Sequence, residues 1–227
     1  MLFVEITGVR FFIFVFYKYH KSSISNIMET LKKDQLAPVQ AKSWIENLTD
    51  EKTFSLVIPE IILQRKTYEI LANKNLNRVR IKLGLEVADA GYQLCVFAVS
   101  AFPDESCECG YFDNITSVYK LTPENEDYSQ KLAEVDEAVN LWKSWRLGET
   151  GDGEGPAVKQ YIYPISYLLT KLELNEIFNV EGKDVAQIGF GISKIFNAMI
   201  YSGLKTTKDN GEDETVFDYG TICPPDC

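Results

Sequence analysis

The chain has 227 residues, of which 45% are apolar and 25% charged, and its formal net charge is −10. This composition is typical of a globular protein that buries a core. The negative charge argues against nucleic acid and anionic membranes as partners, and it would suit a basic protein partner or a cation.

Residues 1–27 differ from the rest of the chain and are interpreted as an N-terminal extension. The apolar run over residues 11–17 is shorter than the roughly 20 residues that a membrane-spanning helix needs. Lys18-Tyr19-His20-Lys21 follows it, where a signal peptide would carry small residues before its cleavage site. We therefore favour Met28 as the natural start and a cytoplasmic location. A weak anchor in residues 1–27, with a membrane-anchored or envelope protein, is the alternative.

The segment 28–120 is predicted to form a first α+β repeat. Pro38 suits a first helical turn, and Trp44 lies on an apolar stripe of helical spacing, so core packing explains it. A strand is expected over residues 53–58, ended by Pro59, and a short helix over residues 66–72.

Two further strands complete this first repeat. Residues 79–85 alternate between apolar and polar, which predicts one dry face and one wet face that carries Arg80 and Lys82. Asp89-Ala90-Gly91 supplies a turn, and the almost wholly apolar residues 93–100 predict a central strand. Cys95 within it is interpreted as core filling. Residues 101–121 are expected to be a connector.

The segment 121–227 is predicted to form the second repeat. Thr122 and Pro123 resemble the cap and first position of a helix that ends near Arg146 and buries its tryptophans. A strand over residues 160–163, ended by Pro164, a short helix that begins with the Thr170–Glu173 capping box, and strands over residues 186–192 and 195–202 follow. The loop 148–156 is expected to lie inside this repeat.

The two segments match each other in order and spacing. Lys42-Ser43-Trp44 recurs as Lys143-Ser144-Trp145, and residues 79–85 fall on residues 186–192. The predicted fold is therefore α+β, a tandem duplication of a helix–strand–helix–strand–strand unit packed with pseudo-two-fold symmetry. An isolated unit would leave open sheet edges, which its twin would cover by packing edge to edge or face to face.

Two pairs of cysteines end the two repeats, Cys107-Glu108-Cys109 in the first and Cys223-Pro224-Pro225-Asp226-Cys227 in the second. Four thiolates could hold a tetrahedral zinc ion if the pairs converge, although neither pair has the usual spacing of zinc ligands. A Cys223–Cys227 disulfide is sterically possible in an oxidising compartment. Thiols without any cofactor are the interpretation that we favour, and zinc through Cys107, Cys109, Cys223 and Cys227 stays the metal hypothesis.

A longer pattern resembles a group of short, uncharacterised bacterial proteins. It consists of Lys-Ser-Trp on the opening helix, the segment Val79-Arg80-Ile81-Lys82-Leu83-Gly84-Leu85, and Val216-Phe217-Asp218-Tyr219 ahead of the Cys-Pro-Pro-Asp-Cys ending. Those proteins contain one such unit with a similar ending, and residues 28–227 would correspond to two copies. The first copy lacks the Cys-Pro ending. The resemblance implies no activity, and it supports Met28 as the start.

Few residues point to catalysis. His20 is the only histidine, which argues against serine and cysteine nucleophiles that borrow a histidine base. We therefore expect a non-catalytic binding or protein-interaction module. The alternative is a carboxylate- or metal-dependent enzyme with its site between the repeats, for which Glu69 and Glu176 occupy matching places.

Overall fold

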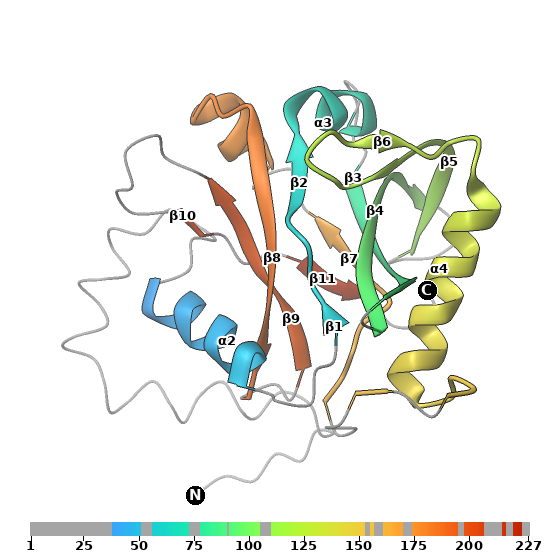
Figure 1. Cartoon of the computed structure of the whole chain (residues 1–227). Coiled ribbons are helices and arrows are strands. Elements are labelled where there is room, and N and C mark those ends of the chain that lie inside the picture. Colours follow the sequence, from blue (N-terminus) through green and yellow to red (C-terminus); the bar gives the residue numbers. More distant parts are fainter. Residues whose placement is uncertain are drawn as a thin grey trace, which may run out of the picture. The chain divides into compact units, whose positions relative to one another are not determined.

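Two β-sheets and the helices packed against them build the described part of this computed structural model (Figure 1). This arrangement confirms the predicted α+β class. The described residues all belong to one compact unit, Asp34–Cys227. The N-terminal extension, residues 1–27, is not among the described residues. The structure describes residues 38–50, 56–72, 78–89, 91–104, 110–152, 155–156, 161–169, 174–194, 198–206, 215–216 and 220–223.

The larger sheet has seven strands in the order β11-β7-β3-β4-β5-β6, with β1 paired in parallel to β4. The smaller sheet has four strands in the order β10-β9-β8-β2. The strands are β1 Leu56–Val57, β2 Ile61–Gln64, β3 Arg78–Ala88, β4 Gly91–Asp104, β5 Gly110–Lys120, β6 Glu126–Asp127, β7 Ser166–Leu169, β8 Val185–Ser193, β9 Ala198–Thr206, β10 Thr215–Val216 and β11 Gly220–Cys223. The helices are α2 Pro38–Asp50, α3 Arg65–Ala72, α4 Leu132–Leu147 and a π-helical turn, η2 Glu176–Val180.

Each sheet contains strands from both halves of the chain. Strand β2 of the first half pairs antiparallel with β8 of the second, and β7 of the second half pairs antiparallel with β3 of the first. The helices also pack on strands of the opposite half. Helix α2 of the first half packs on β8 of the second, and α4 of the second half packs on β3 of the first. The halves are therefore joined by reciprocal strand exchange, an arrangement that the sequence did not indicate. It is compatible with a duplicated unit, and the duplication itself stays a prediction.

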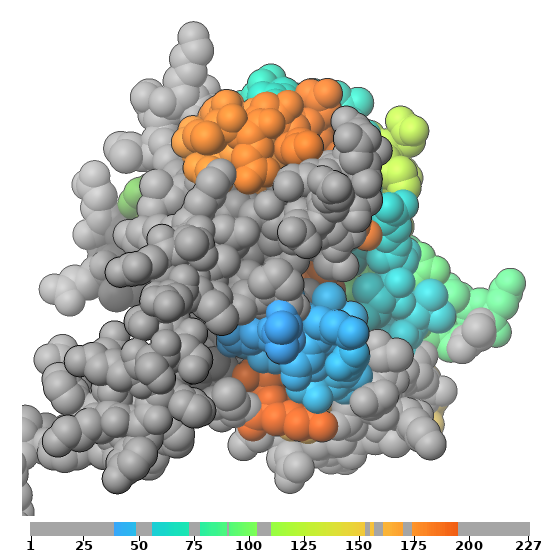
Figure 2. Space-filling model, turned by 90° about the vertical axis from the view of Figure 1, so that its left-hand side faces the viewer, coloured from blue at the N-terminus to red at the C-terminus, as the bar shows by residue number. Residues whose placement is uncertain are grey.

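The apolar faces of the two sheets meet in one core. Ile81 and Leu83 of β3 are fully buried there beside Ile188 and Phe190 of β8. The described elements thus stack in the order α2, smaller sheet, larger sheet, α4 (Figure 1). Helix α2 lies on the outside of the molecule (Figure 2), where its outward residue Val39 is 81% exposed.

Several predicted elements are confirmed. Helices form at Pro38–Asp50 and Arg65–Ala72, and the alternating segments form β3 and β8. Gly91, with φ 116°, follows the turn into β4, which is central between β3 and β5. The three tryptophans are buried, at 5% exposure for Trp44 and 0% for Trp142 and Trp145.

The strand predicted before Pro59 is present as the short β1, Leu56–Val57, and the one predicted before Pro164 has a single bridge, at Ile162, among the described residues. Two strands that the sequence did not predict, β2 and β7, begin after these prolines and join the neighbouring half. Local pattern did not reveal β2 and β7 because each pairs with a strand far away in the chain.

Two further corrections concern the region between the halves. The predicted connector 101–121 contains β5, which pairs along β4. Thr122 does not cap a helix, because α4 begins ten positions later, at Leu132, after the short strand β6. A proline after a capping residue also occurs in turns, and here the Thr122–Asn125 turn returns the chain toward β6. The Thr170–Glu173 capping box lies outside the described residues.

Candidate functional site

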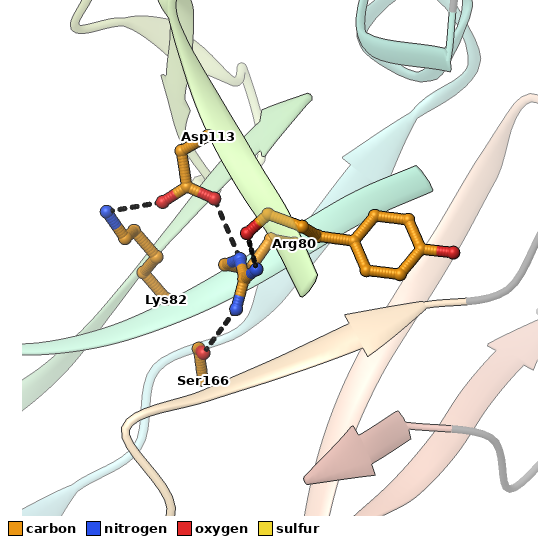
Figure 3. Close-up of polar contacts among 5 residues, drawn as sticks. Arg80, Lys82, Asp113 and Ser166 are labelled. Atoms are coloured by element: carbon orange, nitrogen blue, oxygen red, sulfur yellow. Dashed lines mark hydrogen bonds and ion pairs between the residues drawn. The ribbon is translucent and has the colours of Figure 1, made fainter. Parts of the chain in front are cut away.

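A half-buried carboxylate, Asp113 on β5, bridges two cations on β3. Asp113 Oδ1 lies 2.7 Å from Arg80 Nε, and Asp113 Oδ2 lies 2.8 Å from Lys82 Nζ (Figure 3). The side chains of Arg80, Asp113 and Lys82 are 7%, 18% and 24% exposed. A charge removed from water needs a counterion and hydrogen bonds. Because Asp113 is the counterion of both cations, these ion pairs connect β5 to β3 across the intervening strand β4.

Other polar groups of the larger sheet also contact Arg80. Its Nη2 donates to the backbone oxygen of Tyr111 at 3.0 Å, and its Nη1 lies 3.5 Å from Ser166 Oγ on β7. The guanidinium of Arg78 lies 4.8 Å from the centre of the Tyr111 ring. Figure 3 shows the Arg80 side chain between Asp113 and Ser166. Three strands, β3, β5 and β7, therefore contribute to one polar cluster.

The predicted wet face of β3 is thus not open to solvent. Near Gly84 this face is covered by α4, and at Arg80 it is covered by the ion pair with Asp113. Arg80 is only 6% exposed. The prediction was wrong because an alternating strand indicates the polar face but not whether another element covers that face.

Three cationic side chains, Arg78, Arg80 and Lys82, lie on the first half of β3 in a chain whose net charge is −10. Asp113 pairs with two of them, Arg80 and Lys82. Arg78 instead lies over the ring of Tyr111.

Strand β11 brings one predicted site residue to this cluster. Cys223 pairs with Ser166, and Ser166 pairs with Lys82 on the other side of β7. Neighbouring strands lie about 4.8 Å apart, so the backbone of Cys223 is about 10 Å from that of Lys82. The Cys-Pro-Pro-Asp-Cys segment therefore begins in the same cross-strand row as Lys82.

The other three cysteines of the zinc hypothesis, Cys107, Cys109 and Cys227, lie outside the described residues. In the sequence the first two fall between Asp104, the last residue of β4, and Gly110, the first residue of β5. The cross-strand row that contains Cys223, Ser166 and Lys82 also contains Phe97 on β4. Phe97 lies seven residues before Asp104, which corresponds to roughly 23 Å along that strand. No group of three candidate metal ligands occurs among the residues that the structure describes. A shared zinc site stays a prediction, and it would require the turn and the C-terminal segment to cover that separation.

Cys95 belongs to the core, as predicted. It is buried at 3% exposure on β4. Burial, with a smaller contribution from the Glu86 carboxylate, raises the pKa of its thiol to about 12. Cys95 is therefore a neutral thiol at physiological pH, and it packs with Phe97 and Ala138 under α4.

Asn125 closes the edge of the smaller sheet. Its Nδ2 donates to the backbone oxygen of Ile62 at 2.7 Å, and its Oδ1 accepts from the backbone N–H of Gln64 at 2.9 Å. These are two groups of β2, the edge strand. Asn125 is buried and holds a positive φ of 53°, which asparagine tolerates better than most residues. One side chain thus takes the place of a neighbouring strand.

An acidic surface covers β6 and the first turns of α4. Six carboxylate residues there are exposed, and Lys131 is the one cation between the first and the last of them. The six are Glu124, Glu126, Asp127, Glu134, Asp136 and Glu137. Together with Lys131 these residues carry a net charge of −5, which is half of the net charge of the whole chain. We call these residues the β6–α4 acidic surface.

The alternative of a carboxylate enzyme between the repeats gains no support from the described residues. Glu69 is exposed on α3 and Glu176 is half-buried on η2. The buried polar side chains of the described part include no carboxylate, and the space between the sheets is filled by apolar residues. The polar residues that the structure brings together, Arg80 and Asp113, were not predicted, because no local spacing relates them.

No family model, curated protein or solved structure matches this chain. Within the described residues, no helix is long and apolar enough to cross a membrane.

Proposed function

We propose that this protein is a non-catalytic binding module that recognises a basic protein partner through the β6–α4 acidic surface. The supporting observation is the concentration of charge, because residues Glu124 to Glu137 carry half of the net charge of the chain on one exposed stretch. Complementary charge speeds association and selects against partners of like charge.

Hydrogen bonds favour the charged form of one carboxylate of this surface, Asp127. The hydroxyl and the backbone N–H of Ser129 both donate to Asp127, at 2.5 and 2.8 Å, and these bonds lower the pKa of its carboxyl group. The cation within this stretch, Lys131, interacts with a neighbouring ring, since its ammonium lies 4.5 Å from the centre of the Tyr128 ring. The surface therefore presents negative charge on a regular strand and helix.

Binding of a short oligolysine peptide, measured by calorimetry at low and at physiological salt, tests the proposal. The variant Glu134→Gln/Asp136→Asn/Glu137→Gln should lose most of the affinity. The matched control is Glu60→Gln/Glu69→Gln/Asp89→Asn, which removes equal charge from exposed positions elsewhere and should bind almost normally. Equal weakening by both variants would mean that net charge alone attracts the peptide. An oligoglutamate peptide should not bind.

A further inference from the structure

Strand β5 has an open side along its first residues. Residues 110–114 pair with β4 on one side. On the other side, β6 is the only strand that the described residues place against β5, and it reaches Tyr119 and Lys120 alone. Within the described part of the chain, the Tyr111 oxygen is the one backbone group of this stretch that bonds outside β4, and its donor is Arg80. The unpaired groups of this open edge, residues 110–114, can pair with another extended chain.

The open edge lacks the charged side chains that protect edge strands against such pairing. Asp113 is the only charged residue between positions 110 and 114. Its carboxylate pairs with Arg80 and Lys82 of β3, on the far side of β4. The large apolar side chains of Phe112 and Ile115 are 54% and 55% exposed. The edge is therefore accessible and unprotected.

An aromatic pair lies on one face of this edge. Phe102 of β4 and Phe112 of β5 are cross-strand partners, and their rings stack with centres 5.5 Å apart. Because side chains alternate along a strand, Phe112 lies on the face opposite to that of its neighbour Asp113. A strand added to β5 would place every second side chain on the face of Phe112. Apolar side chains at those positions would cover the exposed part of that ring.

The β6–α4 acidic surface adjoins the open edge. The bulge at residues 115–117 shortens β5, because Asn114 and Val118 pair with adjacent residues of β4. The open edge therefore ends close to β6, whose exposed residues Glu126 and Asp127 lie along the same side of β5. A strand added there would continue the line of β6 beside these carboxylates. Basic side chains would complement them, whereas a second copy of this chain, with its net charge of −10, would bring like charges together.

We propose that the partner binds as an extended segment of alternating basic and apolar residues, which adds to the open edge of β5 as a further strand of the larger sheet. The backbone of this segment pairs with residues 110–114, and its apolar side chains cover Phe112. Its basic side chains lie beside the β6–α4 acidic surface. The inference rests on the proposed function for the charge of the partner, and it adds the form in which the partner binds.

Two peptides separate strand addition from attraction by charge alone. One peptide alternates lysine and valine, and the other has the same sequence with methyl groups on all of its backbone nitrogens, which keep its charge but prevent strand pairing. Calorimetry with the full-length protein at physiological salt should give the first peptide an affinity about tenfold or more above that of the second, as expected for a few lost hydrogen bonds. Equal affinities would overturn strand addition and leave the acidic surface as the binding site.

Hydrogen exchange of the full-length protein shows where the lysine–valine peptide binds. The backbone amides of residues 110–114 that do not bond to β4 should exchange about tenfold or more slowly in the complex. Binding that leaves these amides unprotected would overturn the inference. Protection of the same amides at high protein concentration without peptide would overturn it as well, because the edge would then belong to a second copy of the chain.

A pair of variants tests the aromatic face. Phe112→Ser should weaken binding of the lysine–valine peptide about fivefold, through lost apolar contact, and should leave oligolysine binding unchanged. Leu147→Ser removes a side chain of similar exposure, 52%, from the end of α4, and it should bind both peptides normally. Oligolysine binding without lysine–valine binding would reject strand addition alone. Absence of binding by either peptide would reject the proposed function as well, whereas lysine–valine binding with protected amides but no oligolysine binding would reject only the acidic surface.

Discussion

Gly191 on β8 lies directly under Trp44 on α2. A Cβ atom built on Gly191 would lie 2.8 Å from both the carbonyl carbon and the Cβ of Trp44. Gly84 on β3 has the same relation to Ala138 on α4, with 3.0 Å between the built Cβ and that of Ala138. Each helix therefore approaches its sheet at a glycine, and the strand that carries this glycine belongs to the opposite half of the chain.

The variant Gly191→Ala should destabilise the protein by about 1–3 kcal/mol, because the added methyl group must push the backbone of α2 away from β8. Gly84→Ala should cost less, since one of its close neighbours is the Cys95 sulfur rather than helix backbone. The measurement is the free energy of unfolding in urea. Gly151→Ala is the control, because a Cβ there meets nothing within 4 Å. If Gly191→Ala unfolds at the same urea concentration as the control, α2 does not rest on this glycine.

The match between the two halves of the sequence correctly paired these glycines but not the tryptophans. Matching residues 79–85 to 186–192 placed Gly84 opposite Gly191, which the helix contacts support. Matching the two Lys-Ser-Trp triplets placed Trp44 opposite Trp145, whereas Ala138 makes the contact equivalent to that of Trp44. A strand residue must be glycine where a helix approaches the sheet too closely for a Cβ atom, so the match between the two glycines reflects the packing. A triplet repeated on two helices does not show which strand each tryptophan contacts.

The variant Asp113→Asn should cost about 3–5 kcal/mol of unfolding free energy, because it leaves the buried Arg80 guanidinium without its carboxylate. The double variant Arg80→Met/Asp113→Leu should recover much of the loss, since it removes the buried guanidinium together with its carboxylate, while the remaining cation, Lys82, is 24% exposed and reaches water. Chemical denaturation of the single and double variants measures both effects.

Asp184→Asn serves as the comparison for Asp113→Asn. Asp184 also pairs with an arginine, Arg65, at 3.2 Å, but its side chain is 91% exposed. An exposed ion pair contributes about 1 kcal/mol or less. Equal costs for Asp113→Asn and Asp184→Asn would show that the Arg80 cluster is not a buried, coupled group.

The core and the central strands were predictable because their signals are local. Alternation predicted β3 and β8, and continuous apolar sequence predicted the central position of β4. Strands β2 and β7 were missed because their partners, β8 and β3, lie in the other half of the chain. Asp113 was missed for the same reason, since its partner Arg80 is two strands away and nothing in the spacing joins them.

The variant Asn125→Ala should lower the unfolding free energy by about 1–3 kcal/mol, because Ile62 oxygen and Gln64 N–H lose their partner. Alanine also tolerates the positive φ poorly, so Asn125→Gly should be somewhat more stable than Asn125→Ala. Thermal unfolding compares them. Asn179→Ala, at an exposed residue whose Nδ2 donates to Asn175, should be nearly neutral. A wild-type melting temperature for Asn125→Ala would show that β2 needs no edge partner.

Cys95 should make the protein less stable in alkali. Its pKa is about 12 in the folded state, mainly through burial, against 9.0 for the unperturbed thiol. The folded state therefore retains the proton while the unfolded state loses it. The stabilisation that comes from the neutral thiol is complete below pH 9 and is lost as the pH rises toward 12, at up to about 1.4 kcal/mol per pH unit. Urea unfolding between pH 8 and 11 measures the slope, which should be shallower in Cys95→Ala even though that variant is less stable throughout. Identical slopes would mean that the Cys95 thiol ionises as readily in the folded protein as in the unfolded chain.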